Sequence, residues 1–171
     1  MKIRPRLKVP PFKQTDASRC GPASVKMVLD YYGIIASEDE VAKSCNHTFE
    51  RGCSNEDMKT ALEKYGLSVE IKQDNSFDDV SSWVKKKVPV IVDWFTGGIA
   101  PSLRDFPNGH ASVVVGIDAN NIHIIDPENG KVRSIKKKDF IRVWFDWKNN
   151  NQTPNKESLL LRLMIIATKK P

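Results

Sequence analysis

Cysteine and histidine are scarce in this sequence, with three of each among 171 residues. An odd number of cysteines leaves at least one thiol outside any disulfide, so a disulfide framework does not define the fold. The cysteines are therefore reactive or simply buried. Any site that needs a cysteine and a histidine must be drawn from a small set of positions.

Long apolar runs are also missing. No stretch approaches the roughly 20 apolar residues of a membrane-spanning helix, and the basic N-terminus, MKIRPRLKVPPFK, lacks the apolar centre of a secretory signal. The sequence predicts a protein with no membrane span and a cytoplasmic location. Its length fits one domain over residues 1–171.

The net charge of +6 comes from lysines spread along the chain and from two short runs, Lys85 to Lys87 and Lys136 to Lys138. Each run lies in or beside a predicted helix, which indicates a solvated face. Arginines are few, and no motif combines basic with aromatic residues. We therefore expect no nucleic-acid partner.

Helical patterns fill the first third of the chain. One helix is predicted from Cys20 to its stop at Gly33, one from the capping pattern at Ser37, and one from Ser54 to Gly66. The segment LSVEI alternates like a strand, and a fourth helix follows Ser76. The first part of the domain is thus predicted to be mainly helical.

From Val88 onward the pattern changes to β-branched strands. VPVIVDW, HASVVVGID, NIHIIDP and KVRSI, with turn residues between the last three, predict an antiparallel sheet. A last helix is expected over residues 139–145, an exposed excursion over residues 148–158, and a return to the core as a strand or short helix. The long Gly- and Pro-containing segment 95–109 suggests a functional or mobile loop. The fold class is α+β.

Cys20 stands at the start of the first predicted helix, immediately before Gly21 and Pro22. Unpaired N–H groups and the helix dipole stabilise negative charge there, and this lowers the pKa of a thiol. A thiolate is the nucleophilic form of cysteine, and a histidine usually completes its activation. The position indicates a nucleophile.

Among the histidines, His110 is the best candidate for the catalytic base. It follows the glycine-containing loop and begins an apolar strand, whereas His47 lies in a polar link and His123 lies within a strand. If the next strand forms a hairpin with that of His110, residues 110 and 126 have their midpoint near the turn at 118. Asp126 would then lie near His110 and accept its ring N–H.

Gln14, six residues before Cys20, could supply an amide donor. Attack on a carbonyl produces an oxyanion, which the Gln14 side chain and the N–H of Cys20 could stabilise. A metal site built from Cys45, His47 and Cys53 is the weaker hypothesis for the remaining residues, because it lacks a recognised zinc spacing and a fourth ligand.

These residues, with PVIV, GHASVVVGI and IIDPENG, resemble the papain-like cysteine peptidases of family thirty-nine, from Lys13 to Trp147. Members of that family remove double-glycine leaders from bacteriocin precursors. The resemblance implies a papain-like fold, with an N-terminal helical half packed on a C-terminal antiparallel sheet. It also implies Gln14 as oxyanion donor, Cys20 as nucleophile, His110 as base and acid, and Asp126 as its orienting partner.

The expected function is hydrolysis of a peptide bond through a thioester, without a metal or other cofactor. The substrate would be a peptide or protein, such as a leader peptide, and a separate exporter is a candidate partner, since many members of the family are joined to one. An acyl or peptidyl transferase would use the same four residues, and a non-catalytic peptide-binding domain is a third alternative. The sequence leaves these alternatives open.

Overall fold

The computed structural model describes residues 6–96, 109–148 and 156–170, and combines five helices with eight strands in those ranges. In chain order the elements are α1 (Cys20–Tyr31), α2 (Glu38–Ser44), α3 (Asn55–Lys64), β1 (Leu67–Lys72), α4 (Phe77–Lys85), β2 (Val90–Phe95), β3 (Gly109–Ile117), β4 (Asn121–Asp126), β5 (Lys131–Lys136), α5 (Lys137–Phe140), β6 (Phe145–Trp147), β7 (Leu159–Leu161) and β8 (Met164–Lys169).

Local sequence signals define the helix boundaries. Ser37, Ser54 and Ser76 each form a capping box, in which the serine accepts an N–H bond from the third helical residue and the acidic side chain there accepts the serine N–H. Gly33 and Gly66, behind α1 and α3, have φ of 77° and 89°, a conformation that glycine adopts without strain. The four predicted helices of the first half are confirmed.

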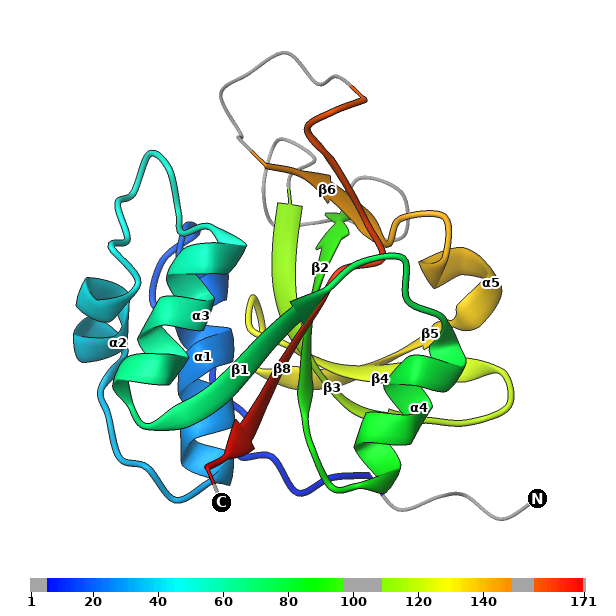
Figure 1. Cartoon of the computed structure of the whole chain (residues 1–171), viewed down its shortest axis with the longest axis horizontal. Coiled ribbons are helices and arrows are strands. Elements are labelled where there is room, and N and C mark those ends of the chain that lie inside the picture. Colours follow the sequence, from blue (N-terminus) through cyan, green and yellow to red (C-terminus); the bar gives the residue numbers. More distant parts are fainter. Residues whose placement is uncertain (1–5, 97–108, 149–155, 171) are drawn as a thin grey trace.

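The central sheet has six strands in the order β1-β8-β2-β3-β4-β5, and all neighbouring pairs are antiparallel. The four strands predicted after Val88 are four adjacent strands of it. The remaining two are β1 and β8, so the LSVEI strand is part of the same sheet (Figure 1). A separate two-stranded sheet pairs β6 with β7.

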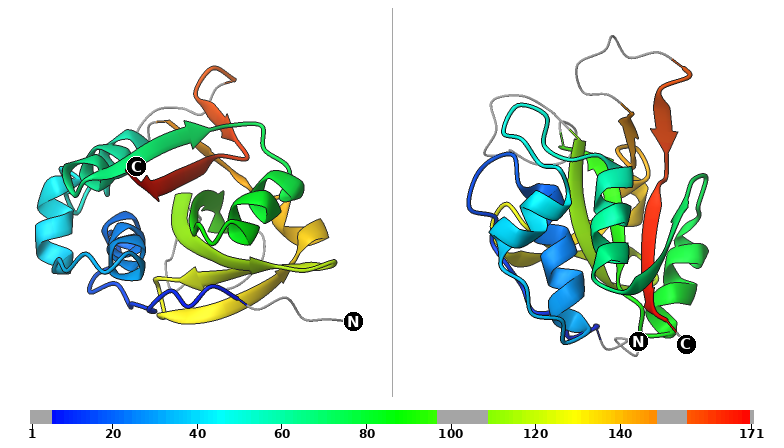
Figure 2. Two further views of the ribbon diagram at one scale, coloured as in Figure 1. Left: turned by 60° about the horizontal axis from the view of Figure 1, so that its bottom comes forward. Right: turned by 60° about the vertical axis from the view of Figure 1, so that its left-hand side comes forward.

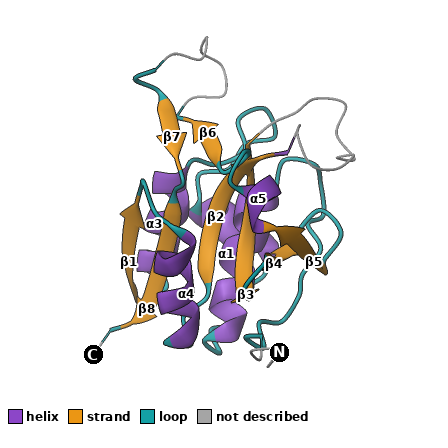
Figure 3. Cartoon of the chain, turned by 90° about the vertical axis from the view of Figure 1, so that its right-hand side faces the viewer, coloured by secondary structure: helices purple, strands orange, loops and turns teal. Residues whose placement is uncertain are grey.

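Two apolar cores cover the two faces of the sheet. On one face, α1, α2 and α3 pack over alternate residues of the strands, such as Ile91 and Val113. On the other, Val92 and Val114 pack with α4 and α5. Figure 3 shows α4 in front of the sheet and α1 behind it. The α+β class is confirmed, although α4 and α5 lie on the face opposite the N-terminal helices.

The N-terminal segment closes one side of the molecule. The Leu7 N–H donates to the Val115 carbonyl (2.7 Å) and the Gln14 N–H donates to the Pro127 carbonyl (2.8 Å). Figure 2 shows this segment running beside the curved end of the sheet. Gln14 is thereby fixed next to the turn that follows β4.

The prediction of a helix over residues 139–145 was wrong in its extent. The helix is α5, a single turn, and Phe145 already belongs to β6. The Phe95 N–H donates to the Val143 carbonyl (2.8 Å), and the rings of Phe95 and Phe145 stack with centroids 5.2 Å apart. Packing on the end of β2 therefore overrides the helical pattern.

The predicted loop at residues 95–109 and the predicted excursion at residues 148–158 are described only in part. Residues 97–108 of the predicted loop and 149–155 of the predicted excursion lie outside the described residues. The segment after the excursion forms two strands, β7 and β8. Within the ranges that the structure describes, no helix has both the length and the apolar character needed to cross a membrane.

Candidate active site

The structure joins His110 to Asp126 across the β3–β4 hairpin. His110 Nε2 lies 2.7 Å from Asp126 Oδ1, and both side chains are at most 2% exposed. The register pairs Val113 with Ile125, so Asp126 lies two residues from the position opposite His110. The predicted proximity of these two residues is confirmed, and the hairpin explains it.

Hydrogen bonding determines the charge state of the pair. Burial alone would lower the pKa of His110, but its bond to Asp126 and its interaction with Cys20 outweigh burial and raise the pKa to about 9. Burial would likewise raise the pKa of Asp126, but the bonds from His110, Arg133 and the Glu128 N–H lower it to about 2. At neutral pH the pair is therefore an imidazolium beside a carboxylate.

Arg133, on β5, completes the surroundings of the carboxylate. Its Nη1 lies 2.5 Å from Asp126 Oδ2, and its guanidinium lies over the Trp94 ring, 5.6 Å from the ring centroid. Trp94 in turn packs edge-on against His110 with centroids 5.6 Å apart. Arg133 and Trp94 thus hold the His110–Asp126 pair from two sides. Neither was predicted, because the β5 register that places Arg133 near Asp126 was unknown.

Cys20 is the first residue of α1, as predicted, and it is partly exposed. Whereas α2, α3 and α4 have capping boxes, the N-cap residue Arg19 makes no side-chain capping bond, and the first turn of α1 holds no acidic residue. The first-turn N–H groups are therefore not consumed by a cap. This end of α1 favours a negative charge such as a thiolate.

Cys20 and His110 interact across the interface between α1 and the sheet. The Cys20 interaction is one of the causes of the raised pKa of His110. Nε2 of the ring is occupied by Asp126, and Nδ1 has no nitrogen or oxygen partner among the described residues. Nδ1 is thus left for the sulfur, which is the arrangement that an imidazolium and a thiolate need to form an ion pair.

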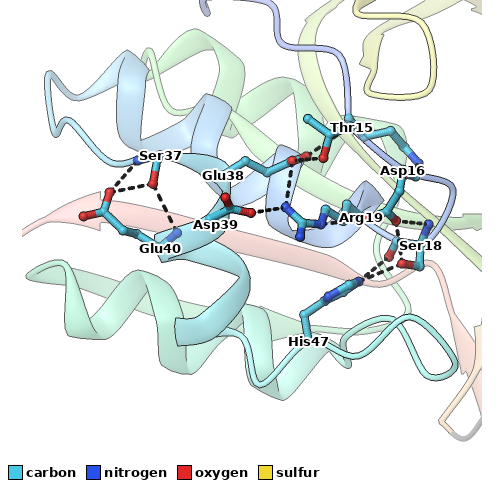
Figure 4. Close-up of polar contacts among 10 residues, drawn as sticks. Thr15, Asp16, Ser18, Arg19, Ser37, Glu38, Asp39, Glu40 and His47 are labelled. Carbon is cyan, nitrogen blue, oxygen red and sulfur yellow. Dashed lines mark hydrogen bonds and ion pairs between the residues drawn. The ribbon is translucent and has the colours of Figure 1, made fainter.

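A network of charges fixes the loop that leads to Cys20 (Figure 4). Arg19 pairs with Asp16 (2.8 Å), with Asp39 (2.6 Å) and with Glu38 (3.1 Å). Glu38 also accepts bonds from the N–H and the hydroxyl of Thr15. Glu38 and Asp39 are the first two residues of α2, so this helix holds the loop at Thr15, next to Gln14, and at Arg19, next to Cys20. It thereby fixes Gln14 relative to Cys20.

Gln14 is buried at the other end of this loop, with 7% of its surface exposed. Its Nε2 donates to the Asp16 carbonyl (2.6 Å), and its Oε1 has no hydrogen-bond partner within the described part of the chain. One of the two amide hydrogens is therefore committed to the loop. The second is the one available to an oxyanion.

The other two histidines serve different local structures. His47 Nε2 lies 2.9 Å from Ser18 Oγ, and so contributes to the loop before Cys20. His123 lies between Asp118 (2.9 Å) and Ser134 (2.8 Å) on the sheet. Of the three residues named in the metal-site hypothesis, His47 has its Nε2 on Ser18, and in the described ranges no group of three or more possible ligands is arranged to hold a metal ion.

A pair of buried carboxyl groups, missed by the sequence analysis, borders the same region. Asp93 and Asp146 share a hydrogen bond, and Asn55 Nδ2 donates to Asp93 Oδ2 (2.7 Å). Burial, followed by the charge of Asp93, raises the pKa of Asp146 to about 9, and burial also raises the pKa of Asp93. A Cβ on Gly109 would lie 2.0 Å from Asp146 Oδ2, so this carboxyl group packs directly against the residue that precedes His110.

Comparison with known proteins gives a consistent result. A model of the Peptidase C39-like family matches residues 6–152. No curated protein matches the chain. Solved structures with the same fold include a double glycine motif protease from an AMS/PCAT transporter in complex with the leader peptide, at 24% identity, a TM-score of 0.66 and coverage of 96% of both chains.

Two further structures cover almost the whole chain. The peptidase domain of Streptococcus ComA, a bifunctional ABC transporter, is 20% identical with a TM-score of 0.68, and covers 95% of this chain and 99% of its own. A protein assigned as a C39-like peptidase from Bacillus anthracis is 15% identical with a TM-score of 0.71. The match covers 98% of this chain and 99% of that protein. At these identities the structures establish the papain-like fold.

Proposed function

The chain belongs to the Peptidase C39-like family, and from this premise we propose that it is a cysteine peptidase with Cys20 as its nucleophile. The observation that carries the proposal is the buried His110–Asp126 bond beside Cys20, which keeps the imidazole protonated at neutral pH. A protonated ring facing a thiol at a helix N-terminus supports an ion pair.

The first half of the reaction forms a thioester. The Cys20 thiolate attacks the carbonyl carbon of the scissile peptide bond, and the carbonyl oxygen becomes an oxyanion. The Gln14 amide and the Cys20 N–H donate to that oxyanion. His110 then gives its proton to the leaving nitrogen, so the C–N bond breaks, an amine departs and Cys20 holds the acyl group.

The second half returns the enzyme to its starting state. The now neutral His110 takes a proton from water, and the hydroxide attacks the thioester carbonyl. The C–S bond breaks, which releases a carboxylic acid and restores the thiolate beside the imidazolium. Asp126 holds the ring orientation in both halves and stabilises its positive charge. A transferase would differ only here, with an amine in place of water.

The proposed substrate is the leader segment of a secreted peptide, and the proposed partner is a separate exporter. Support for both comes from two of the solved relatives, which are a leader-bound double glycine motif protease and the peptidase domain of an ABC transporter. The present chain is similar to these whole domains, with coverage of 95% or more on each side.

A digestion experiment tests the proposal. The protein is incubated with a peptide library that includes leader-like sequences ending in Gly-Gly, and products are identified by mass spectrometry. We expect free carboxyl products from the wild type and from Cys45→Ala, and none from Cys20→Ala. Products carrying an added amine would identify a transferase, and binding without product formation would identify a binding domain.

A further inference from the structure

All three cysteines lie around the start of α1, although the proposed peptidase reaction uses only one of them. Cys20 begins α1, Cys45 follows the last residue of α2, and Cys53 lies two residues before α3. No disulfide joins them in the structure. Cys45 is completely buried, whereas Cys20 and Cys53 are partly exposed as whole residues.

Cys53 is the link between the other two thiols. A Cβ placed on Gly21 would lie 2.3 Å from Cys53 Sγ, so the sulfur occupies the space beside the residue that follows Cys20. Cys53 also shares a side-chain hydrogen bond with Cys45 and experiences the charge of Cys20. The thiols therefore form a series from the partly exposed Cys20, through Cys53, to the buried Cys45.

The three thiols differ in reactivity. A thiolate is the form that hydroperoxides oxidise, and susceptibility follows thiolate character and exposure. Cys20 combines partial exposure with a helix N-terminus and a protonated His110. The hydrogen bond to Cys45 and burial raise the pKa of Cys53 well above its ordinary value, so Cys53 remains a thiol. Oxidation should therefore begin at Cys20, with a second thiol close by.

We propose that Cys53 and Cys45 form a redox dithiol that resolves the oxidised form of Cys20 and protects it from irreversible oxidation by hydroperoxides. The inference rests on the proposed function, because Cys20 must be a thiolate for oxidation to begin there. It assigns a modification site to two cysteines that have no part in peptide hydrolysis.

The chemistry proceeds in three balanced steps. The Cys20 thiolate attacks a hydroperoxide, ROOH, to give the sulfenic acid and, after proton uptake, the alcohol ROH. Cys53 then attacks the sulfenic sulfur and gives up its proton to the departing hydroxide, so that a Cys20–Cys53 disulfide forms and the hydroxide leaves as water. Finally Cys45 loses its proton as it attacks the Cys53 sulfur; the Cys20–Cys53 bond breaks, a Cys45–Cys53 disulfide forms, and Cys20 leaves as a thiolate that can take up that proton.

The final disulfide would close a short loop, because Cys45 and Cys53 are eight positions apart. A thiol reductant reverses this disulfide, whereas a sulfinic acid on Cys20 would be permanent under the same treatment. The dithiol would thus turn a damaging oxidation of the nucleophile into a reversible one.

The test uses peroxide treatment of reduced wild-type protein, Cys53→Ser and Cys45→Ser. Each sample is treated with hydrogen peroxide, blocked with N-ethylmaleimide and mapped by peptide mass spectrometry. Iodoacetamide labelling before and after dithiothreitol reports whether Cys20 is reactive, without any need for a substrate. Melting temperatures of the reduced proteins show whether each variant is folded.

The two serine variants should give opposite products. In the wild type we expect a Cys45–Cys53 disulfide with Cys20 still able to react. In Cys45→Ser we expect a trapped Cys20–Cys53 disulfide, with labelling of Cys20 lost until dithiothreitol is added. In Cys53→Ser we expect Cys20 to gain two oxygen atoms and to lose labelling permanently.

Two results would overturn the inference. Equal formation of the sulfinic acid on Cys20 in wild type and Cys53→Ser would exclude resolution by Cys53. If Cys53→Ser does not fold, absence of the trapped disulfide in Cys45→Ser would have the same meaning. If Cys20 of the reduced wild type is labelled rapidly but no disulfide forms after peroxide treatment, only this inference fails. If Cys20 of the reduced wild type is labelled slowly, the proposed function is contradicted as well.

Discussion

At the scale of single residues, the central feature is a histidine that keeps its proton in a buried site. Burial lowers the pKa of His110 and so disfavours the imidazolium, whereas the bond to the Asp126 carboxylate raises this pKa and stabilises the imidazolium. A protonated ring is needed when the leaving nitrogen takes up a proton, so activity should depend on the pKa of His110. The Asp126 carboxylate determines where the alkaline side of the pH profile lies.

Asp126→Asn should move the alkaline limb of kcat/KM to lower pH. In the wild type, activity should fall as pH rises through about 9, where the folded protein loses the His110 proton. An amide keeps the shape of the carboxylate but lacks its charge, so the pKa of His110 falls and the decline begins earlier. Asp118→Asn, which alters the contact to His123 in the same hairpin, should leave the limb in place.

Gln14→Ala should lower kcat by about a hundredfold, because an oxyanion donor acts mainly in the transition state. KM and the alkylation rate of Cys20 should stay near their wild-type values. Gln14→Glu should be at least as harmful, since it places a carboxylate beside the oxyanion. Near-normal kcat in a stable Gln14→Ala variant would contradict the oxyanion role, so both constants must be measured on a cleaved peptide.

At the scale of elements, α2 positions the loop that leads into α1. The acidic first turn of α2 stabilises its own N-terminus, and the same turn holds Thr15 and Arg19 on the loop between Gln14 and Cys20. A helix that does not contribute a catalytic group thus determines how two proposed catalytic groups are placed.

Glu38→Gln should lower kcat by about tenfold or more, because it loosens that loop and small displacements of reacting groups are costly. Glu40→Gln is the matched control: it lies in the same turn, but its side chain bonds only within the Ser37 capping box. That variant should lower helix stability slightly and leave kcat close to normal. Equal loss of kcat in both variants would show that α2 acts only through its stability.

Local signals predicted most of the elements, and non-local packing accounts for the rest. The serines before α2, α3 and α4 were sufficient to place those helices, because a capping box is formed by residues close in the sequence. The pairing of β1 with β8 joins residues about a hundred positions apart, for which the chain gives no local signal. The helix expected at residues 139–145 was shortened by the packing of Phe145 on Phe95.

The same distinction holds within the candidate site. Cys20 could be predicted because it stands at a helix start, and His110 and Asp126 because they lie on the two strands of one hairpin. Both features are local in the sequence. The Asp93–Asp146 pair could not, because it depends on a contact between β2 and β6, which lie far apart in the chain. Arg133 lies in the hairpin next to Asp126, but placing its side chain on Asp126 requires the exact β4–β5 register, which the sequence did not supply.

At the scale of the whole molecule, the buried Asp93–Asp146 pair links β6 to the central sheet beside the site. An aspartate in an unfolded chain has a pKa of about 3.9, and Asp146 has a pKa of about 9 in the folded protein. Between about pH 4 and pH 9, Asp146 therefore carries a proton in the folded protein that it would lose in the unfolded chain. The stability that this proton provides is complete below about pH 4 and is lost as pH rises through about 9.

Asp146→Asn should therefore flatten the decline of melting temperature between neutral and alkaline pH. The asparagine amide can donate to Asp93 as the protonated carboxyl group does, and it has no proton to lose. Thermal unfolding followed from pH 5 to pH 10 measures the effect. The exposed Asp74→Asn variant should keep the wild-type slope, and an unchanged slope in Asp146→Asn would show that the shared proton does not support the fold.

The most direct test of the ion pair is the rate of Cys20 alkylation by iodoacetamide as a function of pH, since it needs no substrate. We predict that wild-type Cys20 reacts rapidly down to pH 6, far below the ordinary thiol pKa of about 8.5. His110→Ala should lose this reactivity at low pH, and His123→Ala should keep it. A wild-type rate that rises only near pH 8.5, unchanged in His110→Ala, would contradict the assignment of Cys20 and His110 as the catalytic pair.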